Sequence, residues 1–301
     1  MTFKRRLFVF VLVCFSTAIP VLAQTTDNDT LPTKTVTVGD IDVAYQDFGK
    51  GEPLVMIMGY GGSMDLWSPR LLQLLSDQYH VYVFDNRGMG HSTSSPTEYS
   101  IPLFAEDTLG LMDVCGIEKA YVLGWSMGAE IAQELAISQP DRVEGLVLIA
   151  GSPGGKEQIA PNPEILRQLT DTSGNSLQRG LRLIGLLFPQ DWMKIHPTIW
   201  SYFPINATMN PSERSMRQLH AMMEWEGSYA RLDKIEVPTL VICGNEDVVF
   251  APQNSILLAA GIRNARLVQI PDGGQGVIFQ YPDLVADEMA SFFKKTEVEG
   301  R

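Results

Sequence analysis

Residues 121–130 read YVLGWSMGAE and place a Gly-x-Ser-x-Gly motif directly after a short apolar run. Helix-forming sequence follows at once, so the stretch predicts a strand, a sharp turn and a helix in that order. Such a turn holds its central residue, Ser126, in a strained backbone conformation. Gly124 and Gly128 are required because a Cβ at either position would collide with the neighbouring strand or helix. We therefore expect the Ser126 hydroxyl at the carboxyl edge of a sheet, with a helix N-terminus beneath it.

The same alternation of strand and helix extends over most of the chain. Residues 35–38 and 41–45 alternate in polarity around Gly39-Asp40 and predict a hairpin. Further strands are expected in six short, mostly apolar runs: 53–58, 80–84, 119–124, 143–150, 238–244 and 266–270. Helical patterns occupy 67–79, 101–115, 126–138, 252–260 and 282–294. These patterns predict an α/β fold with a mostly parallel, eight-stranded sheet between helices.

Residues 151–231 break this alternation after the sixth expected strand, 143–150. The segment is helical in pattern and contains seven prolines. We predict a helical cap inserted into a core formed by residues 34–150 and 232–296. The cap's large apolar residues fit two interpretations, an apolar tunnel for an acyl chain or the ordinary packing of helices on a sheet. These residues are Phe188, Trp192, Met193, Ile199, Trp200, Phe203, Met222 and Trp225.

The first 23 residues have the pattern of a signal peptide. Three basic residues at 4–6 precede nine apolar residues at 7–15, and small residues before Gln24 suit cleavage after Ala23. The protein is therefore expected to be exported to the periplasm or the medium. The alternative is an uncleaved membrane anchor, although residues 7–23 are only 17 long and include Pro20. Residues 24–33 are polar and aperiodic and predict a disordered lead-in.

Charge and composition exclude several classes of partner. The net charge of −12 argues against nucleic acid, which requires a basic face. No HExxH, CxxC or other ligand spacing predicts a metal, and no cofactor is expected.

Cys115 and Cys243 remain after the leader, and the expected strand order places them too far apart to form a disulfide. We predict two free, buried thiols.

Five stretches together carry a resemblance to a known family. They are the glycine loop at Gly59, the turn at 85–92, the nucleophile elbow at Ser126, and the corners at 244–247 and 273–276. In these stretches, and in their order, the chain resembles the α/β-hydrolase fold family from about Thr35 to Lys294. The resemblance implies a serine hydrolase that acts on a small ester-like molecule.

The resemblance assigns a role to each part of this site. Ser126 is the expected nucleophile, and the backbone N–H groups of Met127 and Tyr60 are the expected oxyanion donors. Relatives often carry His-Gly before the second donor, where this chain has Met58-Gly59. Because the donor is a backbone group, this departure leaves it in place. The residues expected to contact the substrate are Gly59, Trp67 and Trp125.

The acid and the base are expected at the two later corners. Asp247 matches the acid of the family's Gly-x-x-Asp corner, and its neighbour Glu246 is the residue most easily confused with it. At the second corner the resemblance implies a histidine, but the chain has Gln275. An amide can accept a hydrogen bond from Ser126 and donate one to Asp247, yet it cannot take up the serine proton.

Three functional interpretations follow from Gln275. The first is a serine hydrolase of small or medium apolar esters or lactones, impaired unless another base is recruited. The second is a non-catalytic ligand-binding protein, and the third is a normal enzyme that differs by this one change. The histidines outside the family's position are weak candidates for a substitute base: His80, His91, His196 and His220.

Overall fold

The computed structural model describes residues 32–198, 202–203 and 213–299. The predicted leader, nearly all of the predicted lead-in, and Ile199 and Trp200 of the cap lie outside these ranges. Thr33–Arg301 forms one compact unit. No helix in the described part of the chain has the length and hydropathy that a membrane span requires.

The strands form one eight-stranded sheet in the order β1-β2-β4-β3-β5-β6-β7-β8. β1 pairs antiparallel with β2, β2 pairs antiparallel with β4, and all other neighbours are parallel. The predicted fold class is therefore confirmed. The strands are β1 (Lys34–Val38), β2 (Ile41–Gly49), β3 (Glu52–Ile57), β4 (Tyr79–Phe84), β5 (Ala120–Trp125), β6 (Val143–Ile149), β7 (Thr239–Gly244) and β8 (Ala265–Ile270).

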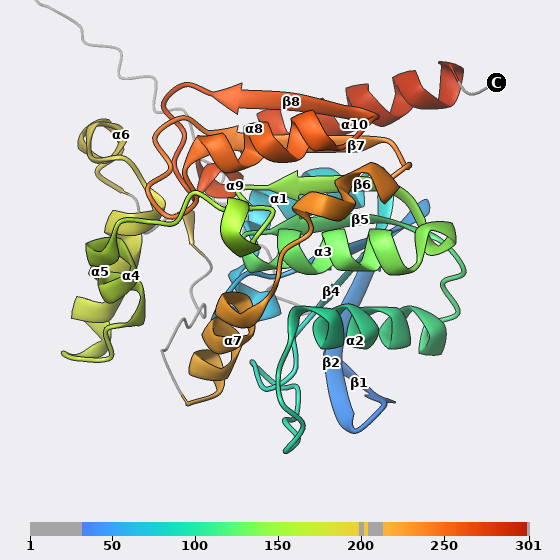
Figure 1. Ribbon diagram of the computed structural model, residues 1–301, viewed down its shortest axis with the longest axis horizontal. Coiled ribbons are helices and arrows are strands. Elements are labelled where there is room, and N and C mark those ends of the chain that lie inside the picture. The colour runs from blue at the N-terminus through green and yellow to red at the C-terminus, as the bar shows by residue number, and fades with distance from the viewer. Residues whose placement is uncertain (1–31, 199–201, 204–212, 300–301) are drawn as a thin grey trace, which may run out of the picture. The chain divides into compact units, whose positions relative to one another are not determined.

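Helices cover both faces of this sheet (Figure 1). On one face α2 (Ile101–Val114), α3 (Met127–Ser138) and α8 (Pro252–Gly261) pack in one apolar cluster. On the other face α1 (Pro69–Ser76), α9 (Val277–Gln280) and α10 (Pro282–Glu299) belong to a second cluster.

Strand β3 shows why the central strands are continuous apolar runs. Its residues alternate between the two clusters, with Leu54 and Met56 in one and Val55 and Ile57 in the other. All four side chains are fully buried. A strand covered on both faces cannot alternate apolar with polar residues, so its sequence is apolar throughout.

The segment between β6 and β7 contributes four helices among its described residues. These are α4 (Pro163–Thr170), α5 (Ser176–Leu187), α6 (Gln190–Ile195) and α7 (Glu213–Glu224). Helices α4, α5 and α7 lie beside the carboxyl ends of the parallel strands (Figure 1). Short 3-10 turns complete the chain at Met64–Leu66, Pro140–Arg142, Gly155–Glu157 and Tyr229–Lys234.

Most of the described aromatic residues of the cap pack against the core. Phe188 stacks on Trp192, and both belong to the cluster that includes α1, α9 and α10. Trp225 belongs to the opposite cluster, and its Nε1–H donates to the buried Glu134 Oε1 over 2.7 Å. For these three residues the packing interpretation holds.

The two cysteines of the described residues, Cys115 and Cys243, are free, as predicted. Cys243 is buried in β7, but Cys115 is only partly buried at the end of α2. The prediction of burial is therefore wrong for Cys115.

An ion pair with almost no solvent access ties the turn after β4 to α2. Arg87, which is 1% exposed, donates from Nε and Nη2 to the two carboxylate oxygens of Asp107, each over 2.6 Å. Arg87 also lies 3.1 Å from Asp40. Asp85 in the same turn accepts from the Met64 and His91 backbone N–H groups. These contacts fix the loops at the carboxyl edge of the sheet.

Removing one partner of this ion pair should destabilise the fold strongly. Asp107→Ala leaves the Arg87 charge buried with only Asp40 beside it, and we expect the free energy of unfolding to fall by about 3 kcal/mol. Asp283→Ala is the matched control, because its pair with Arg70 is half exposed and should contribute less than about 1 kcal/mol. Urea denaturation measures both. Similar losses in the two variants would contradict this role.

Candidate active site

The turn between β5 and α3 has the backbone strain that its motif predicts. Ser126 has φ 59° and ψ −125°, a conformation that L-residues other than glycine rarely adopt. A Cβ at Gly124 would lie 2.2 Å from the Gly128 oxygen, and one at Gly128 would lie 2.0 Å from the Ile57 oxygen. Both positions therefore require glycine. The Ser126 N–H donates to the Ile149 carbonyl over 2.9 Å, which ties the turn to β6.

Two later corners meet beside this turn. A Cβ at Gly244 would lie 2.1 Å from the Gly273 oxygen, so the loops after β7 and β8 touch through their backbones. The Glu246 N–H donates to the same Gly273 oxygen over 2.9 Å. This contact leaves the Glu246 side chain exposed and buries Asp247, which is 5% exposed. The structure thus brings Asp247, and not Glu246, to the Gln275 corner.

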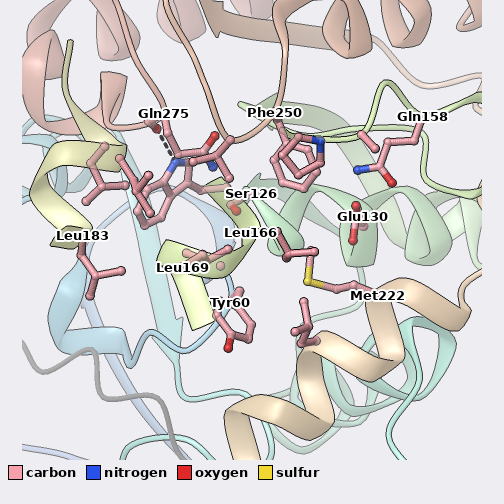
Figure 2. A pocket seen from close by; sticks show the side chains of 18 of the residues that line it. Tyr60, Ser126, Glu130, Gln158, Leu166, Leu169, Leu183, Met222, Phe250 and Gln275 are labelled. Atoms are coloured by element: carbon pink, nitrogen blue, oxygen red, sulfur yellow. Dashed lines mark hydrogen bonds between the residues drawn. The ribbon is translucent and has the colours of Figure 1, made fainter. Parts of the chain in front are cut away.

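The Gln275 side chain lies between the Ser126 hydroxyl and the Asp247 carboxyl. When Asp247 is ionised, it can only accept hydrogen bonds, so the amide nitrogen faces Asp247 and the amide oxygen faces Ser126. Gln275 Nε2 then donates to Asp247 Oδ2 over 2.6 Å and to Oδ1 over 3.1 Å, and Oε1 accepts from Ser126 Oγ over 3.0 Å. The Trp125 Nε1–H donates to the Gln275 carbonyl oxygen over 2.9 Å (Figure 2). The backbone and the side chain of Gln275 are therefore both held in place.

The protonation state of Asp247 is linked to this amide orientation. Burial raises the pKa of Asp247 to about 8, although the Phe250 and Val249 N–H groups oppose the shift by donating to it. A protonated Asp247 suits the reversed amide, in which its O–H donates to the amide oxygen and Nε2 lies 3.3 Å from the Ala150 carbonyl. Neither orientation provides a group that can take up the serine proton.

The glycine loop after β3 passes directly against the serine. A Cβ at Gly59 would lie 2.9 Å from Ser126 Cβ and 3.4 Å from its Oγ. The Gly61 N–H donates to Gln218 Oε1 on α7 over 2.8 Å, so a cap helix holds this loop. Among the described residues, neither the Tyr60 N–H nor the Met127 N–H donates to a protein acceptor. Both backbone amides remain available to a ligand oxygen.

A cavity of about 300 Å³ opens beside Ser126 and Gln275 (Figure 2). Gly59 and Trp125, two of the three residues expected to contact the substrate, line it, and so does Tyr60. Most of its remaining wall comes from apolar residues of the cap and of the loop after β7, namely Ala160, Pro161, Leu166, Leu169, Leu183, Leu186, Leu187, Leu219, Met222, Met223, Val249 and Phe250. Its size and apolar lining are typical of a small-molecule site.

Two predictions about the residues that line the cavity are wrong. Trp67 is 1% exposed and does not line the cavity, because it packs in the core behind Trp125 with ring centroids 6.2 Å apart. Of the described cap residues expected to line a tunnel, only Met222 reaches the cavity. Leucines of α4, α5 and α7 take the place of the aromatic residues, because the aromatic side chains fill the core.

None of the four histidines lines the cavity. His80 lies 3.1 Å from Asp47 on neighbouring strands. His196 stacks on Trp192, and His91 and His220 are exposed. No substitute base of this type therefore reaches Ser126. Nor does the described part of the chain contain a cluster of His, Cys, Asp and Glu that could hold a metal ion.

Two polar residues of the cavity, Gln158 and Glu130, were not expected from the sequence. Glu130 lies one helical turn after Ser126, is 2% exposed and lines the cavity. Burial raises the pKa of Glu130 to about 8, although Ser152 opposes the shift by donating a hydrogen bond. A carboxylate among Ala129, Ile131 and Ala132, on the helix that the motif opens, is the signal that could have identified it.

Comparisons with known proteins agree with this geometry. Residues 52–282 match the alpha/beta hydrolase fold family. The chain is 27% identical to the proposed carbamate hydrolase RutD of Azorhizobium caulinodans over 84% of this chain and 96% of that protein. It is 30% identical to the proposed non-heme bromoperoxidase BpoC of Mycobacterium tuberculosis, over 84% of this chain and 98% of the relative.

A solved structure extends the likeness to three dimensions. A hydrolase from Pseudomonas aeruginosa PA01 superposes with a TM-score of 0.72 at 26% identity, covering 87% of this chain and 98% of that one. The matched residues include the strained serine turn and the two corners that meet beside it. The chain therefore belongs to the α/β-hydrolase fold family.

Proposed function

We propose that the protein binds small or medium apolar esters or lactones and hydrolyses them through Ser126, slowly, because Gln275 occupies the position of the general base. The observation that carries the proposal is the position of the Gln275 side chain between Ser126 and Asp247, beside an apolar cavity. With Asp247 ionised, the amide hydrogen-bonds to both residues. The proposal rests on a hydrolase-like family and fold.

The proposed chemistry begins with attack of Ser126 Oγ on the carbonyl carbon of the ligand. The carbonyl oxygen gains negative charge, and the N–H groups of Tyr60 and Met127 would stabilise it. The serine proton must leave at the same time. The ester C–O bond then breaks, and the alkoxide gains a proton and departs as the alcohol. Water next attacks the acyl-serine, which releases the acid and restores the Ser126 hydroxyl. Gln275 Oε1 accepts a hydrogen bond from the hydroxyl but does not take up its proton. The site therefore keeps ligand binding and oxyanion stabilisation, but water must accept the serine proton.

The size of this impairment can be bounded. Loss of a triad histidine lowers turnover by about 10⁶, whereas oxyanion stabilisation and binding retain a rate about 10³–10⁴ above that in water.

The relative RutD is named for carbamate hydrolysis, and a carbamate, like an ester, has a carbonyl carbon open to attack. This likeness supports a carbonyl substrate.

A second candidate function is ligand binding without turnover. The observation that favours it is the hydrogen bonding of the Gln275 amide, which, with Asp247 ionised, accepts from Ser126 and donates to Asp247. In this case the apolar cavity selects the ligand and the site has no chemical step. Stabilisation by an ester that is never hydrolysed would distinguish this function from slow hydrolysis.

We also propose that the chain is exported and that residues 1–23 are removed. The basic residues at 4–6 followed by nine apolar residues support this proposal.

Restoring a histidine should restore turnover. Gln275→His places an imidazole between Ser126 and Asp247, and we expect hydrolysis of p-nitrophenyl butyrate to rise by about 10³ or more. The release of p-nitrophenol by the purified proteins measures the effect. The double variant Gln275→His/Ser126→Ala is the control and should lose the gain. Equal rates in wild type and in Ser126→Ala would show that Ser126 is not the nucleophile.

Asp247 should make the stability of the fold depend on pH. Its folded pKa of about 8 lies above the ordinary 3.8, so its stabilising contribution is complete below about pH 4 and is lost as the pH rises to about 8. The free energy of unfolding should therefore fall over this range, with a part contributed by Glu130. In Asp247→Asn the fall should be smaller, because the amide keeps an acceptor for Val249 and Phe250 but does not titrate.

Chemical denaturation at intervals between pH 4 and 8 measures this slope. Asp141→Asn, at an exposed position, is the control and should have the slope of wild type. If Asp247→Asn also had that slope, the raised pKa of Asp247 would be contradicted.

The leader should be absent from the mature protein. Expression of the full chain in a bacterium with a periplasm should yield a soluble periplasmic or extracellular form that begins at Gln24, as determined by intact-mass measurement. A chain of full mass in the membrane fraction would instead support the anchor.

A further inference from the structure

Glu130 contributes a carboxyl group to a cavity wall that is otherwise mostly apolar. The residue belongs to α3 and is 2% exposed. Its Oε1 accepts from the Ser152 hydroxyl over 2.8 Å. Its Oε2 is buried and has no hydrogen-bond partner among the described residues. An unpartnered carboxyl oxygen at this depth costs stability, so its presence requires an explanation.

No positively charged side chain pairs with the Glu130 carboxyl among the described residues. Its described contacts include no ion pair with a lysine, arginine or histidine. The cap and the loop after β7 present apolar side chains to this part of the cavity, among them Met222 and Phe250. Gln158 also lines the cavity, but no hydrogen bond joins it to Glu130 among the described residues. The carboxyl therefore lies in an apolar environment with one hydroxyl donor.

We propose that Glu130 anchors the ligand by donating its Oε2–H to an acceptor oxygen, a ketone carbonyl, an ether or a hydroxyl, at a distance from the ester that meets Ser126. The inference rests on the proposed function only for the placement of the ester at Ser126. The ligand expected from this inference is an apolar ester that carries a second oxygen-containing group. A simple alkyl ester lacks that group.

Two features make Oε2 a donor. The Oε1 atom already accepts from Ser152, so a proton on the carboxyl belongs on Oε2. The neutral form is favoured because the carboxyl is buried with no cation beside it. The terminal torsion of a glutamate is broad, so the carboxyl can adjust to an acceptor in the cavity that Glu130 lines.

Matched esters test this assignment by binding alone. Methyl hexanoate and its 3-oxo, 4-oxo and 5-oxo analogues have one chain length and differ only in the distal carbonyl. Titration calorimetry on the wild-type protein should give at least one oxo ester a Kd about five- to tenfold below that of the hexanoate, the effect of one hydrogen bond. The same preference is expected in Ser126→Ala, so the result does not depend on turnover.

Two variants locate the source of the preference. Glu130→Leu keeps the approximate volume but removes the donor, and it should bind the oxo and alkyl esters equally. Glu130→Gln keeps an acceptor for Ser152 and an N–H donor at the other position, and it should retain most of the preference.

Two results would overturn the inference. One is a wild-type protein that binds no oxo ester more tightly than the hexanoate, an outcome that needs no variant to fold. The other is a preference that persists in Glu130→Leu. Failure of the proposed hydrolysis would appear separately, as equal turnover in wild type and Ser126→Ala.

Discussion

The Gln275 amide joins three segments that are far apart in the sequence, because it bonds to Ser126 after β5 and to Asp247 after β7 from its own position after β8. This contact is possible because parallel strands bring their carboxyl ends to one edge of the sheet. Glycines make the approach close enough: backbone meets backbone at Gly244 and Gly273, and Gly59 lies against Ser126. The geometry of a triad is thus retained around a group that hydrogen-bonds but does not take up a proton.

Much of this arrangement could be predicted from the sequence, because it depends on local signals. Apolar runs predicted the buried strands, and the Gly-x-Ser-x-Gly motif predicted the strained turn at Ser126. The walls of the cavity could not be predicted in the same way. Trp67 and Phe188 are large and apolar, and only the packed structure shows that they fill the core while leucines of α4, α5 and α7 face the ligand space. Position in three dimensions, not residue type, decides between core and wall.

The two buried carboxyl groups at the site differ from Asp107 in their surroundings. Elsewhere a buried carboxylate such as Asp107 is paired with Arg87. At the site Asp247 and Glu130 are buried with no cation beside them, and burial raises the pKa of each to about 8. A positively charged imidazole would be the natural partner of Asp247, and the neutral amide of Gln275 supplies only a hydrogen bond. Most of the side chains that the cap presents to the cavity are apolar, and polar contacts with a ligand are stronger in such surroundings.

The central claim is that Gln275, in either orientation of its amide, gives Ser126 no proton acceptor. The most direct test is the rate at which a fluorophosphonate labels Ser126 between pH 5.5 and 8.5, followed by intact-mass measurement. The account predicts slow labelling without the inflection that an imidazole produces near its ordinary pKa of about 6.5. Rapid labelling that rises through such an inflection would contradict it, because a base would then reach the serine that the described structure does not place there.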